Sequence, residues 1–126
     1  MAPDLILMVG IGGAAGGYAR FRLTLRIQSA TRTAFPLGTL LVNLSGSFLL
    51  GLLIPALLNA GLSDRIHALI AVGVLGAFTT FSTFALEAVL LHREGKRGIA
   101  GLYAACSLAG GLLSVAAGSA LGAYFV

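Results

Sequence analysis

Nine consecutive residues, Gly76 to Phe84, place four hydroxyl groups and three phenyl rings inside an otherwise apolar stretch. Hydrocarbon offers no hydrogen-bond partners, so a polar, glycine-containing interruption of a membrane helix is tolerated where it packs in protein or lines an ion or water path. Hydroxyl donors and phenyl edges suit an anion, whereas the carbonyl oxygens of an unwound helix suit a cation. We therefore expect the chemistry of this chain to be concentrated in this segment.

Neutral hydrogen-bond donors also occur in the other apolar stretches. Asn43 carries amide N–H groups, and Tyr103 and Ser107 are spaced four apart, so a helix stacks their hydroxyls along one face. Ser82 and Thr83 add hydroxyls beside the phenyl rings. Together these side chains could replace the hydration shell of a small anion without holding it against a buried cation.

Phe81 and Phe84 are three apart and share a helix face, where the positive edge of a ring can face an anion. For an isolated pair of this kind core packing is the preferred interpretation, and the surrounding motif reverses that preference. Arg20 ends an apolar run of about 16 residues and lies in or near the membrane, either as a snorkelling side chain or in a positive vestibule that attracts anions. Glu87 is the one acidic residue inside a predicted span, so proton coupling has to be considered.

The composition is that of a membrane protein with short connections. The chain has 126 residues, of which 58% are hydrophobic and 10% charged, and its mean hydropathy is +1.00. Since each span needs roughly 20 residues, we expect one all-helical domain over residues 1–126, with spans of about 4–27, 36–60, 66–92 and 97–125. The connections are too short to cross the bilayer, so successive helices are antiparallel and both termini lie on one side. The third helix should be broken near its middle.

Small residues recur at the spacing of close helix packing: Gly12/Gly16, Gly13/Gly17, Gly118/Gly122 and Ser47/Gly51. Helices in lipid associate through close backbone contact and interhelical hydrogen bonds. These residues either pack the four helices of one subunit or form the seam of a dimer. Because four helices enclose little interior, and the chain has no convincing internal repeat, we expect a functional dimer.

Three motifs identify a family resemblance that covers essentially the whole chain. They are Gly13-Ala14-Ala15-Gly16 with Arg20, the stretch from Gly38 to Phe48 (GTLLVNLSGSF), and the segment from Gly76 to Phe84 (GAFTTFSTF). In this combination the sequence resembles the Fluc/CrcB fluoride channels.

The resemblance implies a homodimer of two antiparallel subunits in the cell inner membrane, with two fluoride pores and a central sodium ion that is structural and not transported. By similarity, the backbone oxygens of Gly76 and Thr79 bind sodium, and Arg20 belongs to a vestibule. The residues it places along the pore are Asn43, Phe81, Phe84, Ser82, Thr83, Tyr103 and Ser107.

The sequence departs from the family pattern at two positions. Ala77 stands where a second glycine is usual, which leaves the carbonyl ligands in place but restricts the backbone angles. Gly111 stands where the Tyr103/Ser107 track often continues, so Ser114 is a nearby hydroxyl in a different phase. The sequence therefore does not determine which hydroxyl, if any, forms the outer end of the polar track.

The distribution of positive charge conflicts with dual insertion. Loops one and three and their flanks carry seven basic residues, whereas the other face carries Arg65; the seven are Arg20, Arg22, Arg26, Arg32, Arg93, Lys96 and Arg97. The positive-inside rule would place both loops in the cytoplasm, in one orientation. Either the bias does not fix the orientation of so short a protein, or the chain pairs with an oppositely biased relative; we favour the homodimer.

Three functional classes fit the sequence: a passive channel that lowers cytoplasmic fluoride, a small proton-coupled multidrug-type exporter that uses Glu87, and a noncatalytic membrane scaffold. The exporters carry a glutamate in the first span with a tryptophan nearby, and this chain has neither. We expect no enzyme, because no nucleophile–base set, carboxylate pair or phosphate loop is present. The expected partners are fluoride, a second copy and lipid, with no nucleic acid, and sodium is the expected cofactor.

Overall fold

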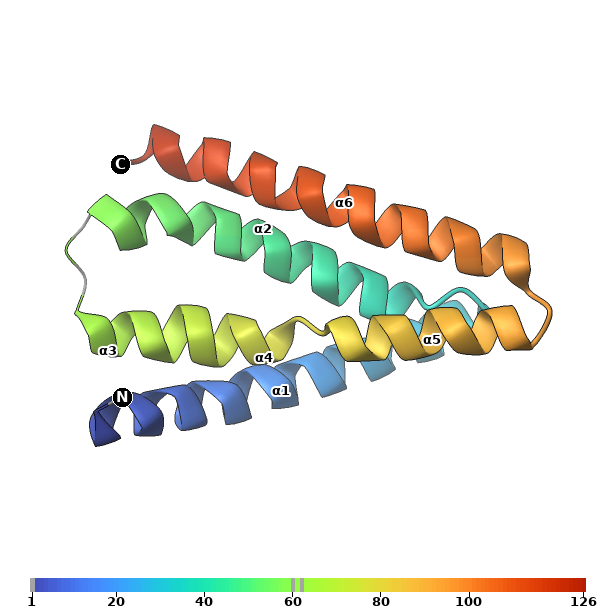
Figure 1. Cartoon of the computed structure of the whole chain (residues 1–126), viewed down its shortest axis with the longest axis horizontal. Helices are drawn as coiled ribbons and strands as arrows, with labels where there is room; N and C mark the ends of the chain where they lie inside the picture. The colour runs from blue at the N-terminus through green and yellow to red at the C-terminus, as the bar shows by residue number, and fades with distance from the viewer. Residues whose placement is uncertain (1, 60, 62) are drawn as a thin grey trace.

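Four antiparallel helical rods run the length of the protein in the computed structural model, which describes residues 2–59, 61 and 63–126 (Figure 1). Both termini lie at one end, together with the connection between the second and third rods, as the short connections require. The elements in chain order are α1 Pro3–Thr31, α2 Leu37–Asn59, α3 Asp64–His67, the π-helix η1 Ala68–Leu75, α4 Gly76–Phe78, α5 Phe81–Arg93 and α6 Arg97–Tyr124. The third rod consists of α3, η1, α4 and α5 in succession.

Three rods are long and apolar enough to cross a membrane: Leu37–Asn59, Asp64–Arg93 and Arg97–Tyr124. They match the last three predicted spans to within two residues at each end, although Ala60, Leu62 and Met1 lie outside the described residues. The first rod, α1, is a helix of 29 residues that carries Arg20, Arg22 and Arg26, and it is not among the three. Whether α1 spans the bilayer as well stays a prediction.

Glycine brings α1 into backbone contact with the third rod. Gly12 and Gly16 are buried, and a Cβ on either would collide with backbone atoms of Leu69 or Val74 in η1. A residue with any side chain at these positions would therefore force the two rods apart. The close approach fixes α1, and with it Arg20 one turn later, against the third rod.

The other small-residue pairs differ in whether they pack helices within one subunit or remain available for the seam of a dimer. Gly118 and Gly122 of α6 are buried against the backbone of α2, and Gly51 of α2 packs on α6 in the same way, so these residues pack helices within one subunit. A Cβ on Gly13 or Gly17, by contrast, would meet nothing within 4 Å. The Gly13/Gly17 face of α1 has no packing role inside the subunit that the structure describes.

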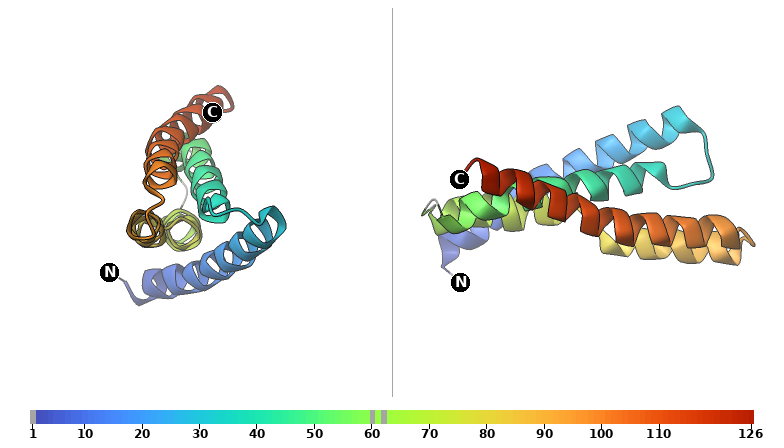
Figure 2. Two further views of the ribbon diagram at one scale, coloured as in Figure 1. Left: turned by 90° about the vertical axis from the view of Figure 1, so that its right-hand side faces the viewer. Right: turned by 90° about the horizontal axis from the view of Figure 1, so that it is seen from above.

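The core lies between α2, α5 and α6. Tyr103, Val42 and Thr39 are the largest fully buried side chains, and Phe84 and Leu91 of α5 belong to the same core. Towards the loops the α1–α2 pair and the α5–α6 pair diverge, as the right view of Figure 2 shows. Large apolar side chains on the outside of the rods are exposed, which suits a surface that faces lipid.

The third rod is broken near its middle, as predicted. Gly76 to Phe78 form the helical turn α4, and the backbone is extended at Thr79 (φ −80°, ψ 154°) and Thr80 (φ −150°, ψ 116°). The extended backbone thus lies within the segment from Gly76 to Phe84 that the sequence singled out, and it begins at Thr79. The break offsets the axis of α5 from that of the preceding part of the rod (Figure 2).

A π-helix, η1, precedes the break, and the sequence gives no sign of it. The Gly76 N–H donates to the carbonyl of Ala71, five residues earlier, which is the π-helical pattern. Gly73 within η1 is buried against Gly12 of α1. The π-helical turns of η1 thus occur where the backbones of the first and third rods are in contact.

Candidate functional site

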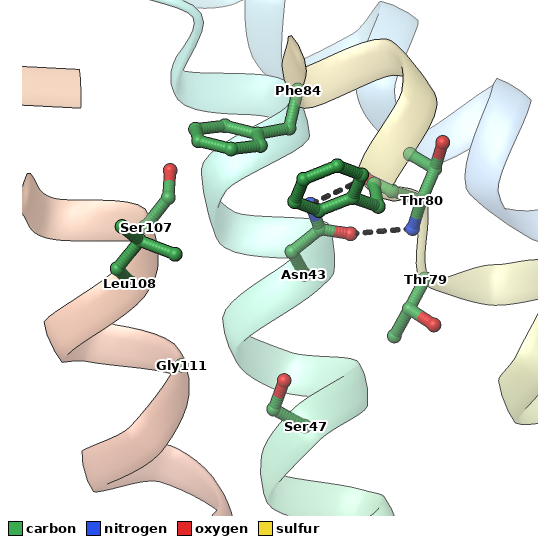
Figure 3. A pocket seen from close by; sticks show the side chains of 9 residues that line it. Asn43, Ser47, Thr79, Thr80, Phe84, Ser107, Leu108 and Gly111 are labelled. Atoms are coloured by element: carbon green, nitrogen blue, oxygen red, sulfur yellow. Dashed lines mark hydrogen bonds between the residues drawn. The ribbon is translucent and has the colours of Figure 1, made fainter. Parts of the chain in front are cut away.

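Asn43 of α2 pairs with the backbone of Thr80 through both ends of its carboxamide (Figure 3). Its Nδ2–H donates to the Thr80 carbonyl at 2.9 Å, and its Oδ1 accepts from the Thr80 N–H at 2.8 Å. An unpaired backbone group in hydrocarbon costs several kcal/mol, roughly, so an extended residue in a membrane helix needs such partners. Asn43 therefore stabilises the break.

The break releases four carbonyl groups, those of residues 76–79, from the helical hydrogen-bond pattern, and the carbonyls of Gly76 and Thr79 are two of them. In an uninterrupted α-helix the N–H groups of Thr80 and Thr83 would donate to the carbonyls of Gly76 and Thr79. Here Thr80 N–H donates to Asn43, and Thr83 N–H donates to the Thr80 hydroxyl at 3.2 Å. Carbonyl oxygens freed in this way are neutral, hard ligands that suit an alkali cation. The carbonyl oxygens of Gly76 and Thr79 are the two ligands that the resemblance implies.

A cavity of about 230 Å³ lies between α2, the break and α6 (Figure 3). It brings together four of the predicted pore residues, Asn43, Phe81, Phe84 and Ser107, from three different rods. The full lining is Asn43, Ser47, Thr79, Thr80, Phe81, Phe84, Ser107, Leu108 and Gly111. The cavity therefore combines amide, hydroxyl and aromatic groups and contains no charged side chain.

The Ser107 hydroxyl is the most informative group in this cavity. Its Oγ is buried and has no hydrogen-bond partner within the part of the chain that the structure describes. Buried polar groups are nearly always paired, so an unpaired one that lines a cavity indicates a ligand or water. As a neutral O–H donor, Ser107 suits an anion.

The two phenylalanines differ in their surroundings although their ring centroids are only 5.6 Å apart. Phe84 is buried and makes an edge contact with Tyr103 at 5.3 Å, while Phe81 is 74% exposed. The cavity is thus bordered on one side by a ring that no other described part of the subunit covers. A second subunit could complete that side.

Beyond Phe84, two hydroxyls converge on Glu87. Thr39 Oγ1 donates to one carboxylate oxygen at 2.9 Å, and the Tyr103 hydroxyl donates to the other at 2.7 Å. Both donors are buried in the core. Tyr103 therefore does not line the same cavity as Ser107 but orients the carboxylate of Glu87, which itself borders a second cavity of about 250 Å³ near the loops.

Arg20 borders a third cavity, of about 190 Å³, on the opposite side of the break. Its Nε is buried without a hydrogen-bond partner among the described residues. Thr39, Thr80 and Thr83 contribute to the same lining, so this cavity places a cation beside several hydroxyls. An arginine in this position can raise the local concentration of an anion.

Four predicted site residues line none of these three cavities: Gly76, Ser82, Tyr103 and Ser114. Ser82 is exposed, with its hydroxyl 3.3 Å from that of Thr80, and Ser114 of α6 is not part of the lining at Ser107. Thr83 lines the Arg20 cavity and not the one with the phenylalanines. The predicted hydroxyls therefore divide between the two sides of the break.

The two departures from the family pattern have simple structural settings. Ala77 lies in the helical turn α4, where an alanine fits without backbone strain. Gly111 faces α2, and a Cβ there would meet only the Ser47 hydroxyl, at 4.0 Å. Ser47 therefore places a hydroxyl beside the position where the track on α6 lacks one.

Sequence reasoning missed three residues of the site: Thr39, Ser47 and Thr80. Thr39, Asn43 and Ser47 are spaced by four along α2, so their shared face could have been predicted from the sequence. Thr80 was recognised only as one hydroxyl among several. Its role as the residue that pairs with Asn43 depends on a contact between positions 37 apart in the chain.

Comparison with known proteins identifies the family. Residues 7–119 match the model of the family described as CrcB-like protein, Camphor Resistance (CrcB). The chain belongs to this family. CrcB-like relatives include a protein named Fluoride-specific ion channel FluC 1 from Bacillus cereus, 44% identical over 100% of this chain and 93% of its own. A FluC 2 from Moorella thermoacetica is 49% identical over 85% of this chain and 87% of its own, and a FluC from Thermus thermophilus is 42% identical over 100% and 99%.

The names of the CrcB-like relatives can be compared with the three functional classes. The relatives are named as channels and not as enzymes, as the sequence leads us to expect. The exporter alternative, in which Glu87 would carry the proton, finds no support from the family. The structure also gives Glu87 two fixed donors, Thr39 and Tyr103.

Proposed function

We propose that this protein is a fluoride-selective passive ion channel that lowers cytoplasmic fluoride. The observation that carries the proposal is the cavity at the break, where neutral donors and two phenyl rings meet and the buried Ser107 hydroxyl has no partner among the described residues. The names of the CrcB-like relatives support the choice of ion.

Fluoride binds its hydration water strongly, so a path has to replace that water with hydrogen-bond donors. The amide of Asn43 and the hydroxyls of Ser47 and Ser107 offer such donors from two facing helices. Since none of them is charged, the ion is held weakly enough to leave again. The edges of Phe81 and Phe84 favour an anion, and their bulk excludes water.

The path continues past Phe84 towards the loops. Tyr103 and Thr39 hold the Glu87 carboxylate at the edge of the second cavity, whose lining also includes Gln28 and Lys96. At the other side of the break, Arg20 borders the vestibule that attracts the ion. In this arrangement transport is passive and follows the fluoride gradient, which points outward when hydrogen fluoride enters the cell and ionises there.

The functional unit that we propose is an antiparallel homodimer with two pores. The exposed Phe81 and the open Gly13/Gly17 face of α1 support a second copy, because both are groups that the described subunit leaves uncovered. Neither fixes the orientation of the partner. The seven basic residues at one end of the molecule against Arg65 at the other argue for a single orientation, so orientation needs its own test.

We further propose a structural, non-transported sodium ion at the dimer centre, held by the Gly76 and Thr79 carbonyls of both copies. The donor set fits, because the N–H groups of Thr80 and Thr83 are directed away from these two carbonyls. When bound, the ion supplies a positive charge that neutral oxygens from two chains can share, which ties the subunits together. The hydrogen bonds of Asn43, Thr80 and Thr83 keep the backbone of the break in the conformation that exposes these oxygens.

Fluoride efflux from proteoliposomes, driven under a potassium/valinomycin clamp and read with a fluoride electrode, tests the channel. We expect rapid efflux of fluoride but not of chloride, lost in Phe81→Ile and in Asn43→Ala. Thr31→Val is the control, because Thr31 is exposed at the end of α1 and its side chain is not part of the lining of any of the three cavities. No fluoride flux from folded dimers supplied with sodium would refute the proposed function.

Cysteine labelling tests the orientation in the membrane of intact cells. Ser63 is exposed between α2 and α3, so Ser63→Cys in a Cys106→Ala background offers one thiol to an impermeant maleimide. A homodimer with dual topology predicts labelling of about half of the thiols from each side. Labelling from one side alone would refute dual topology and favour a pairing with an oppositely oriented relative. The protein is placed in the cell inner (plasma) membrane on either outcome.

A further inference from the structure

Two hydrogen bonds at the break have the same consequence for the backbone. Thr80 N–H donates to Asn43 Oδ1 at 2.8 Å, and Thr83 N–H donates to Thr80 Oγ1 at 3.2 Å. Each side chain occupies an N–H group that an intact α-helix would direct to a carbonyl four residues earlier. The carbonyls that lose these two donors are those of Gly76 and Thr79; the carbonyls of residues 77 and 78 also lose their helical donors at the break, but no side chain takes those N–H groups among the described residues.

We propose that Asn43 and Thr80 are positioning residues that keep the Gly76 and Thr79 carbonyls available for a cation. This inference rests on the proposed function, since it assigns a second task to Asn43 beyond lining the path. If either side chain is removed, the released N–H can return to its helical acceptor. The carbonyl is then engaged within its own chain and no longer serves as a ligand.

Asn43 occupies a special place in this scheme because it belongs to both sites. It lines the cavity with Phe81, Phe84 and Ser107, and it fixes Thr80 by two hydrogen bonds. One amide proton of Nδ2 is used by the Thr80 carbonyl, which leaves the second available to the cavity. Cation binding and the shape of the fluoride path are therefore linked through one carboxamide.

Thr80 allows the role of a hydroxyl to be separated from the role of side-chain bulk, although Thr80 also lines two of the cavities. Thr80→Val keeps the shape of the side chain but removes the hydroxyl that accepts from Thr83 N–H. Thr80→Ser keeps the hydroxyl and removes only a methyl group. A role of Thr80 in simple packing predicts that the serine variant is the more impaired; a role of its hydroxyl predicts the reverse.

On α2, Asn43 has its own matched control. Asn43 and Ser47 line the same cavity, one turn apart, but only Asn43 pairs with the break. Asn43→Ala and Ser47→Ala therefore both change the path, whereas only the first is expected to change the cation site. This pair keeps the inference testable if Thr80→Val fails to fold.

The experiment measures the thermal unfolding midpoint of the purified dimer as sodium replaces N-methylglucamine at constant ionic strength. We expect sodium to stabilise the wild type, Thr80→Ser, Ser47→Ala and Thr31→Val at similar concentrations. For Thr80→Val and Asn43→Ala the sodium concentration at half-maximal stabilisation should rise about tenfold, which corresponds to about 1.4 kcal/mol per site. Fluoride flux is measured in parallel on the same preparations.

The outcomes distinguish this inference from the proposed function. Equal sodium dependence in Thr80→Val, Asn43→Ala and the wild type would overturn the positioning role while leaving the channel intact. Wild-type fluoride flux without any sodium-dependent stabilisation would overturn both the sodium site and this inference. A selective shift in the two variants, with Thr80→Ser unchanged, supports it.

Discussion

Replacing Gly16 with alanine tests how closely the first rod has to approach the third. A Cβ at Gly16 would lie 2.8 Å from the Val74 carbonyl carbon and 3.0 Å from its Cα, and closer still to the carbonyl oxygen. These atoms belong to the backbone of η1, which cannot turn aside as a side chain can. The alanine therefore has to push α1 outward.

The size of the effect follows from two opposing contributions. Overpacking of this kind costs about 1–3 kcal/mol, whereas alanine in place of glycine stabilises a helix by up to about 1 kcal/mol. Gly17→Ala is the matched control, because a Cβ there meets nothing within 4 Å and only the helical contribution remains. We expect Gly16→Ala to be less stable than Gly17→Ala by about 1–3 kcal/mol.

Thermal unfolding of both variants in detergent measures this difference, with fluoride flux as the functional readout. Arg20 lies one turn after Gly16, so an outward shift of α1 also moves it away from Thr80 and Thr83 in their shared cavity. We expect slower flux in Gly16→Ala for this reason. Equal stability of the two variants would refute the packing of α1 on η1. Loss of the dimer in Gly17→Ala alone would locate the subunit seam on the open face of α1.

Three further predictions concern polar contacts. Tyr103→Phe removes one of the two donors to Glu87, so it should lower the stability by about 0.5–1.5 kcal/mol, the usual net contribution of a hydrogen bond. It should also slow fluoride efflux, because Thr39 alone then holds the Glu87 side chain at the edge of the second cavity; an unchanged rate would show that the position of this side chain does not matter. Ser47→Ala should slow fluoride efflux. Adding Gly111→Ser to that variant should restore the efflux, because a side chain at residue 111 fits beside residue 47 and returns a hydroxyl to the same part of the cavity. A folded double variant that stays slow would argue that a hydroxyl at residue 111 cannot replace the one at residue 47. Gln28→Ala should lower stability by about 1–3 kcal/mol, since Gln28 bonds to the backbone of Thr33, Phe35 and Gly38, and an unchanged unfolding midpoint would contradict this.

Features determined by local sequence were predictable. Charges and prolines mark the ends of the rods, and the three spans that meet the membrane criterion end within two residues of the predicted positions. The cluster of hydroxyls and phenyl rings located the break, and helical spacing placed Phe81 and Phe84 on one face. Asn43, Phe81, Phe84 and Ser107 were predicted together, and one cavity contains all four.

Features determined by distant contacts were not predictable. The extended residues are Thr79 and Thr80 because Asn43, on another rod, offers the backbone of Thr80 both a donor and an acceptor. Glu87 could be recognised as an acid in a span, but its partner Thr39 lies 48 positions earlier. Hydrophobicity patterns carry no information about such pairings, since each partner is simply a polar residue on an apolar helix.

The π-helix η1 has a consequence for changes in the length of this chain. A π-helical turn holds one residue more than an α-helical turn, because its N–H groups donate to carbonyls five residues earlier instead of four. Losing one residue from Ala68–Leu75 would therefore let a wide turn close in the α-helical pattern, and Thr80 and Phe84 would keep roughly the orientation that they have towards Asn43 and the core. Losing one residue between Thr80 and Phe84 would instead turn Phe84 by about 100°, since those residues form an α-helix. A change of one residue in length is thus absorbed before the break and not after it.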